Sequence, residues 1–143
     1  MTITTLETSS VVDTAAKLSI YWEDLPAGTQ YSTSSRTITE ADVSAFAALT
    51  GDMNRLHVDA EYAKASVHGQ RIAHGMLVAS FMAGLTSRSI PNQLMEGALF
   101  GVLENTVKFP KATYIGDTIR VDIEVVVQRA TCNTSRGIGR FVR

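Results

Sequence analysis

The fold of this chain is decided by one stretch, Gly75-Met76-Leu77-Val78-Ala79-Ser80-Phe81-Met82-Ala83-Gly84-Leu85-Thr86-Ser87. Large apolar side chains cover most of the circumference of a helix over these residues, and small side chains fill the rest. A helix that is apolar nearly all round has to be buried nearly all round. The remaining chain is therefore expected to wrap around it. The run is too short to span a bilayer, which takes about 20 apolar residues.

Downstream of this helix, apolar residues occupy every second position in two segments. The first covers residues 103–109, and the second covers residues 119–128 after a turn at Gly116-Asp117. A third such segment begins at Gly137. This period predicts antiparallel strands with one buried face. The expected fold class is α+β, with one antiparallel sheet curled around a long central apolar helix.

Upstream, the sequence predicts two further helices and a first strand. Thr39 and Asp42 form a capping box at a helix start, and Gly51 stands where a helix-ending glycine belongs. Asp59 is expected to cap a short helix that reaches Ala65. The strand is expected over residues 31–38. Residues 1–20, rich in Thr and Ser, are predicted to form a flexible arm with a short helix near residues 11–17, and residues 21–143 to form one domain.

Composition excludes several classes of protein. The chain has 143 residues, of which 45% are hydrophobic and 19% charged, as expected for a globular domain. A formal net charge of −1 gives no reason to expect a nucleic-acid partner. The single cysteine, Cys132, excludes an internal disulfide. No secretory signal, transit peptide or membrane span is recognisable, so the expected compartment is the cytoplasm.

The residues that carry chemistry lie just before the apolar helix. Asp52, Asn54 and His57 fall within six residues, and Gly75 follows eighteen residues after His57. A carboxylate and an imidazole this close can hold one water molecule between them, and a helix N-terminus can hold a carbonyl oxygen. The pattern therefore predicts a site that moves protons next to a carbonyl group. Which of Asp52 and His57 is the base stays open.

This Asp-x-Asn-x-x-His stretch, followed by Ile72-Ala73-His74-Gly75-Met76-Leu77, resembles the MaoC-like hydratases, the hot-dog-fold family that contains the (R)-specific enoyl-CoA hydratases. The resemblance runs from about Tyr21 to the C-terminus. It implies a hydro-lyase of fatty acid metabolism that adds water to a trans-2-enoyl-CoA to give an (R)-3-hydroxyacyl-CoA, or the reverse dehydration. It also implies a hot-dog fold and a homodimer or higher homo-oligomer.

The resemblance assigns roles residue by residue. Asp52 and His57 match the family's catalytic acid and histidine. Asn54 and Gly75 are the expected substrate-binding residues: Asn54 matches the amide that braces the loop, and Gly75 matches the backbone N–H that binds the thioester carbonyl oxygen. The resemblance implies no metal and no redox cofactor. Coenzyme A is counted as part of the substrate.

Two features depart from the family. Arg55 stands where the family commonly has proline, which removes a fixed φ and adds a charge. Family members also usually continue beyond the strand that begins at Gly137, so this sheet is expected to expose an edge unless a partner or a longer natural chain covers it.

Other interpretations remain beside the leading one. The substrate could be carried by acyl carrier protein, or the chain could be a non-catalytic acyl-CoA-binding subunit; a thioesterase is disfavoured by the context of Asp52. His74 is predicted to be a structural residue that bonds backbone near the helix start. Tyr62 is a candidate wall of the acyl pocket or a packing residue. Four arginines without an acidic neighbour could meet the phosphates of coenzyme A or form a solvated strand face: Arg129, Arg136, Arg140 and Arg143.

Overall fold

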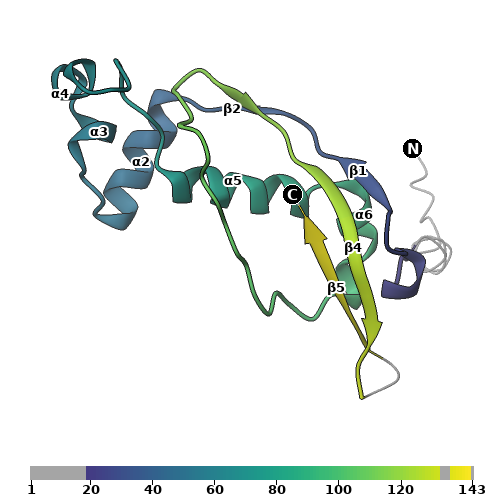
Figure 1. Cartoon of the computed structure of the whole chain (residues 1–143). Helices are drawn as coiled ribbons and strands as arrows, with labels where there is room; N and C mark the ends of the chain where they lie inside the picture. The colour runs from purple at the N-terminus through teal and green to yellow at the C-terminus, as the bar shows by residue number, and fades with distance from the viewer. Residues whose placement is uncertain (1–18, 133–135, 143) are drawn as a thin grey trace, which may run out of the picture. The chain divides into compact units, whose positions relative to one another are not determined.

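The computed structural model describes residues 19–132 and 136–142 (Figure 1). The predicted short helix at residues 11–17 and nearly all of the predicted arm lie outside these residues. Two compact units divide the chain: the first holds residues 1–30, 90–101 and 123–143, and the second holds residues 31–89 and 102–122. Within the described residues, no helix is long and apolar enough to cross a bilayer.

The described elements confirm the α+β class. The helices are η1 (Trp22–Asp24), α2 (Glu40–Thr50), α3 (Arg55–Val58), α4 (Ala60–Ala65), α5 (Gly75–Ser87), α6 (Ile90–Leu94) and η2 (Glu96–Ala98). The strands are β1 (Gln30–Ser32), β2 (Arg36–Thr37), β3 (Thr118–Ile119), β4 (Asp122–Ala130) and β5 (Gly137–Val142). One sheet has the order β1-β4-β5, and a second pairs β2 with β3. The β2–β3 and β4–β5 pairs are antiparallel.

Helix α2 begins and ends where the sequence predicts. Thr39 accepts a hydrogen bond from the Asp42 N–H at 3.2 Å, and the Asp42 carboxylate accepts one from the Thr39 N–H at 2.8 Å. Gly51 ends the helix in the left-handed region, with φ of 76°. Val43 and Ala47 face the core of the second unit. Figure 1 shows α2, α3 and α4 gathered near the N-terminal end of α5.

The core of the second unit forms where α2, α5 and the β2–β3 pair meet. Its buried residues are Ile38, Val43, Ala73 and Leu77, and five partly buried apolar residues pack against them: Phe46, Val78, Phe81, Ile115 and Ile119. Burial of these side chains stabilises the unit by roughly 25 cal/mol per Å² of apolar surface removed from water. The predicted bounds of the central helix are confirmed, since α5 covers Gly75–Ser87.

Helix α5 is not buried all round within one chain, which corrects the sequence prediction. Leu77, Ala79 and Leu85 are buried, but Met76 is 58% exposed, and Ala83 and Gly84 are exposed as well. Leu77 packs into the core of the second unit, and the described residues do not cover the face that carries Met76, Ala83 and Gly84. The helix is therefore more apolar than the packing of a single chain requires.

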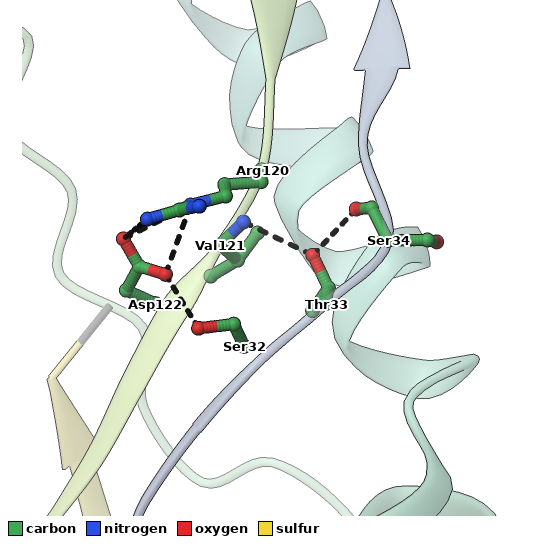
Figure 2. Close-up of polar contacts among 6 residues, drawn as sticks. All are labelled: Ser32, Thr33, Ser34, Arg120, Val121 and Asp122. Carbon is green, nitrogen blue, oxygen red and sulfur yellow. Dashed lines mark hydrogen bonds and ion pairs between the residues drawn. The ribbon is translucent and has the colours of Figure 1, made fainter.

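The single strand predicted over residues 119–128 is split at Arg120 and Val121 (Figure 2). The Thr33 hydroxyl accepts a hydrogen bond from the Val121 N–H at 3.0 Å and donates one to the Ser34 carbonyl at 2.8 Å. A side chain thus takes the place of a backbone group, and the ladder is interrupted there. The predicted buried face persists at Val121, Ile123 and Val125, which are all buried, but it ends before Val127, which is 40% exposed.

A hydrogen bond and an ion pair at Asp122 stabilise the start of β4, next to this break. The Ser32 hydroxyl donates a hydrogen bond to Oδ1 of Asp122 at 2.7 Å, and Nε of Arg120 lies 3.2 Å from the same oxygen (Figure 2). The Ser32 hydroxyl and the Arg120 guanidinium hold the pKa of Asp122 below its ordinary value.

The strand predicted over residues 103–109 does not form, which is a second correction. No strand is assigned between Leu99 and Tyr114. Leu103 is 84% exposed and Phe109 is 51% exposed. Alternation predicts a strand only where a neighbouring strand supplies a ladder and a core covers the apolar face. Neither is supplied to this segment by the described residues of this one chain.

In the first unit, a turn and a small apolar cluster follow the sequence expectations. The Thr29 N–H donates to the Pro26 carbonyl at 3.0 Å, and Gly28 has φ of 91°, so the predicted Pro26–Gly28 turn is confirmed. Leu25, Met95 and Val125 form the buried cluster. Strand β5 begins at Gly137 as predicted and pairs with β4.

Candidate active site

The loop that carries Asp52 is set by the end of α2 and the start of α3, all within the second unit. Gly51 turns the chain out of α2, and the exposed Asp52 follows it. Asn54 is the N-cap of α3: its side-chain oxygen accepts a hydrogen bond from the Leu56 N–H at 3.0 Å. The Asn54 N–H lies 3.3 Å from the Asp52 carboxylate. Asn54 therefore braces this loop, whereas its predicted contact with substrate remains a prediction.

His57 projects from α3 and is half-buried. Its Nδ1 lies 2.8 Å from the carbonyl oxygen of Ile72. A carbonyl oxygen can only accept a hydrogen bond, so Nδ1 carries the hydrogen. In the neutral ring, Nε2 is then the nitrogen with a free lone pair. This tautomer leaves Nε2 able to accept a hydrogen bond or a proton.

His74 is a neighbour of Asp52 and His57 that the sequence analysis did not place in the site. It is 2% exposed and is the residue immediately before α5. Its Nε2 lies 3.0 Å from the backbone carbonyl oxygen of Asp52, so the ring contacts the main chain as predicted, with a partner 22 residues upstream. Its ring stacks on His57 with centroids 3.8 Å apart and lies 5.1 Å from the ring of Phe46. The usable signal was its position beside Gly75, inside the same motif.

Asp52, His57 and His74 converge in space. One donor atom from each lies within 4.8 Å of the other two. These residue types could hold a metal ion at that spacing, but ring geometry argues against it. Imidazole lone pairs lie in the ring planes, and these two planes are inclined by only 30°. Stacked rings direct their lone pairs side by side and not at one ion, so the arrangement fits proton transfer better than metal binding.

Gly75 begins α5, as predicted, and is half-buried. The first N–H groups of a helix have no intrahelical partner, and the helix dipole makes this end favourable for a partial negative charge. A Cβ at this position would lie 3.2 Å from ring carbons of Phe109. The absence of a side chain therefore lets the Phe109 ring approach the start of the helix. The role of the Gly75 N–H as a carbonyl donor remains a prediction.

Arg55 clamps the turn between α3 and α4. Its guanidinium donates to the Asp59 carboxylate at 2.9 and 3.0 Å and lies 4.2 Å from the centre of the Tyr62 ring. Asp59 also caps α4, as predicted, by accepting a hydrogen bond from the Tyr62 N–H at 2.9 Å. That backbone N–H, followed by Arg55, holds the pKa of Asp59 below its ordinary value. Tyr62 thus lies beneath Arg55, and its role as a pocket wall remains a prediction.

The C-terminal arginines are exposed where the structure describes them, at Arg129, Arg136 and Arg140. The guanidinium of Arg136 lies 4.6 Å from the ring centre of Phe100, in the same unit. Arg143 lies outside the described residues. Their contact with coenzyme A phosphates remains a prediction.

Comparison with known proteins gives one consistent result. Residues 24–141 match the model of the MaoC like domain. The chain is 34% identical over 124 residues to the (R)-specific enoyl-CoA hydratase of Rhodospirillum rubrum, an alignment that covers 80% of this chain and 82% of that protein.

Comparison with solved structures points to the same family. The structure titled monoamine oxidase regulatory protein from Archaeoglobus fulgius superposes with a TM-score of 0.69 at 35% identity, covering 79% of this chain and 74% of that one. The (R)-hydratase from A. caviae involved in PHA biosynthesis superposes with a TM-score of 0.62 at 31% identity, covering 75% of this chain and 76% of that one. These neighbours confirm the predicted hot-dog fold. On this evidence the chain belongs to the family of MaoC-like domains.

Proposed function

We propose that this chain is a hydro-lyase that adds water to a trans-2-enoyl-CoA to give an (R)-3-hydroxyacyl-CoA, or catalyses the reverse dehydration. The observation that carries the proposal is the convergence of the Asp52 carboxylate with the imidazole of His57, whose free nitrogen is Nε2. A carboxylate and a neutral imidazole can together accept both hydrogens of one water molecule. The relatives named as (R)-specific enoyl-CoA hydratases support the same reaction.

The proposed reaction needs one nucleophile and one proton relay. The water oxygen bonds to C3 of the enoyl chain as its O–H proton passes to Asp52 or His57. The C2=C3 electron pair moves toward the thioester carbonyl, whose developing negative charge the Gly75 N–H at the start of α5 stabilises. The residue that took the proton from water then delivers it to C2 as the thioester C=O re-forms, which completes the addition. These residues supply the proton transfers themselves, so we propose that no metal or redox cofactor takes part.

We further propose that the chain works as a homodimer or higher homo-oligomer, in the cytoplasm. Support for a partner comes from large apolar side chains that the single chain leaves in water, in the second unit at Met76, Val102, Leu103 and Phe109. Soluble monomers rarely expose many such side chains, and an interface between copies would cover them. Light scattering of the purified chain should give at least twice its 15.5 kDa mass. A monomer would contradict the proposal.

The first experiment follows the loss of enoyl-thioester ultraviolet absorbance when the chain meets crotonyl-CoA. Asp52→Asn and His57→Ala are each expected to lower kcat by about 10²–10⁴-fold, because each removes one proton-transfer group. His68→Ala is the matched control, since His68 lies outside the convergent group. Native turnover that survives both variants would refute the assigned residues. No turnover with crotonyl-CoA, with longer enoyl-CoAs or with crotonyl-acyl carrier protein would favour a non-catalytic acyl-CoA-binding subunit.

A further inference from the structure

We propose that His74 is a positioning residue that holds Asp52 and His57 in one reactive arrangement. The inference rests on the proposed hydro-lyase function, and it assigns His74 no contact with substrate. Two contacts made by a single buried ring carry it: a hydrogen bond to the main chain of Asp52 and a stack on the imidazole of His57.

The first contact fixes the loop. The carbonyl oxygen of Asp52 can only accept, so Nε2 of His74 is the donor over the 3.0 Å that separates them. The other hydrogen bonds of residues 51–54 in the described chain are local and involve partners within four residues. The bond from His74 joins positions 22 residues apart. It is therefore the contact that ties the exposed Asp52 loop to the segment before α5.

The second contact fixes the orientation of His57. The Ile72 carbonyl holds the edge of the His57 ring through Nδ1, and the His74 ring covers one of its faces. Ile72 and His74 belong to one short segment, which is itself anchored. The Ile72 N–H donates to the Leu56 carbonyl at 3.1 Å, and the Ala73 N–H donates to the Thr113 carbonyl at 2.8 Å. The anchored segment at residues 72–74 thus fixes the positions of both Asp52 and His57.

Packing alone does not account for an imidazole at this position. With Nε2 as the donor, Nδ1 of His74 carries no hydrogen, and it is buried without a hydrogen-bond partner among residues 19–132 and 136–142. A buried polar atom without a partner costs about 1–3 kcal/mol. A phenyl ring could fill much of the same space without that cost. The N–H of the imidazole therefore accounts for a histidine at this position, because it donates the hydrogen bond to the Asp52 carbonyl.

Two substitutions separate the two contacts. His74→Phe keeps an aromatic ring against His57 but removes the donor to Asp52. His74→Gln places an amide N–H at the same number of bonds from Cα as Nε2 and removes the ring. We expect His74→Phe to lower kcat on crotonyl-CoA by about 10–100-fold with KM nearly unchanged, because small misplacements of a catalytic group cost that much. His74→Gln is expected to recover a large part of kcat.

A second readout does not depend on activity. Amide hydrogen exchange at Asn54 and His57 reports whether the Asp52 loop is held. We expect faster exchange there in His74→Phe than in the native chain, near-native exchange in His74→Gln, and no change in the control His68→Phe.

The two readouts distinguish the failure of each proposal. If the native chain hydrates no enoyl thioester, the proposed function is refuted. If the native chain and the two variants still show the expected exchange pattern, the conclusion that His74 holds the Asp52 loop stands. Folded His74→Phe with kcat within about twofold of native would overturn the positioning role. Exchange at Asn54 as fast in His74→Gln as in His74→Phe would also overturn it, because an amide donor in place of Nε2 would then not hold the loop. A kcat loss in His74→Gln with near-native exchange would support the second contact, since this variant lacks the ring beside His57.

Discussion

The ring of Phe109 occupies the space that a side chain on Gly75 would need, since a Cβ there would lie 3.2 Å from three of its carbons. Phe109 is half exposed and can shift by the few tenths of an ångström that the contact demands. We therefore expect Gly75→Ala to fold with an unfolding free energy within about 1 kcal/mol of native. Its methyl group would crowd the N–H proposed to bind the thioester carbonyl, so kcat/KM on crotonyl-CoA is expected to fall about tenfold or more.

Gly84→Ala is the matched control in the same helix. A Cβ at Gly84 meets nothing within 4 Å, so the change should raise the unfolding free energy by about 0.5–1 kcal/mol through helix propensity and leave turnover unchanged. Equal loss of turnover in both variants would contradict a local role for Gly75.

Replacing Arg55 with proline should be tolerated. Arg55 is the first residue of α3, a position that proline favours because its N–H has no intrahelical partner. Asn54 before it has φ of −55° and ψ of 131°, the extended region that a residue before proline adopts. We expect Arg55→Pro to retain turnover within about threefold and Arg55→Gly, which lacks both the clamp and the fixed φ, to lose more. Lower turnover in Arg55→Pro than in Arg55→Gly would contradict the fit of proline at this position, and an equally large loss in both would show that the guanidinium itself is required.

The capping box of α2 predicts a measurable loss of stability. Thr39→Ala removes the side-chain acceptor of the Asp42 N–H and one donor to the Asp42 carboxylate. An N-cap of this kind contributes about 1 kcal/mol, so the urea midpoint should fall accordingly. Ser44→Ala, on the exposed side of the same helix, should leave the midpoint unchanged or slightly higher. A smaller loss for Thr39→Ala than for Ser44→Ala would show that the cap contributes nothing.

Acid should destabilise the chain below about pH 4. Partial burial alone would raise the pKa of Asp42, but hydrogen bonds from Thr39 and Arg36 outweigh it and hold that pKa below 3.8. The pKa values of Asp59 and Asp122 are lowered as well. A carboxyl whose pKa is lower in the folded chain than in the unfolded chain stabilises the fold above the unfolded value. That contribution disappears as the pH falls through the folded pKa.

Urea midpoints at pH 6 and pH 3 test this sign. The urea midpoint of the native chain should be lower at pH 3 than at pH 6. The midpoint of Asp122→Asn should fall less, because the amide lacks the stabilisation by an ionised carboxylate at both pH values. An equal or larger acid loss in Asp122→Asn would contradict the linkage.

Local signals predicted the helix ends of the second unit. Thr39, Gly51 and Asp59 set helix ends through hydrogen bonds within a few residues, and all three act as the sequence indicates. The bounds of α5 follow from composition and Gly75 in the same way. Such features are encoded in short windows, so one chain suffices to read them.

Features that depend on distant partners were harder to predict. The alternation at residues 103–109 indicates a buried face, but the covering surface is not supplied within the described chain, and no strand forms. The break at Val121 depends on the hydroxyl of Thr33, which lies 88 residues away in sequence. The roles of Asp52 and His57 remain predictions, but their proximity to His74 could not be predicted from sequence spacing, because a tertiary contact creates it.

The adjacency of His74 and Gly75 limits how this site could be re-engineered. A single peptide bond joins the residue that anchors the Asp52 loop to the residue at the start of α5. Any backbone shift that enlarged the space around Gly75 would also move His74 and, through its hydrogen bond, the Asp52 loop. A backbone change that alters which acyl chains fit would therefore also alter the rate of reaction. Remodelling for bulkier acyl chains should therefore shorten the Phe109 side chain, whose ring lies against Gly75, and leave the backbone of residues 72–75 untouched.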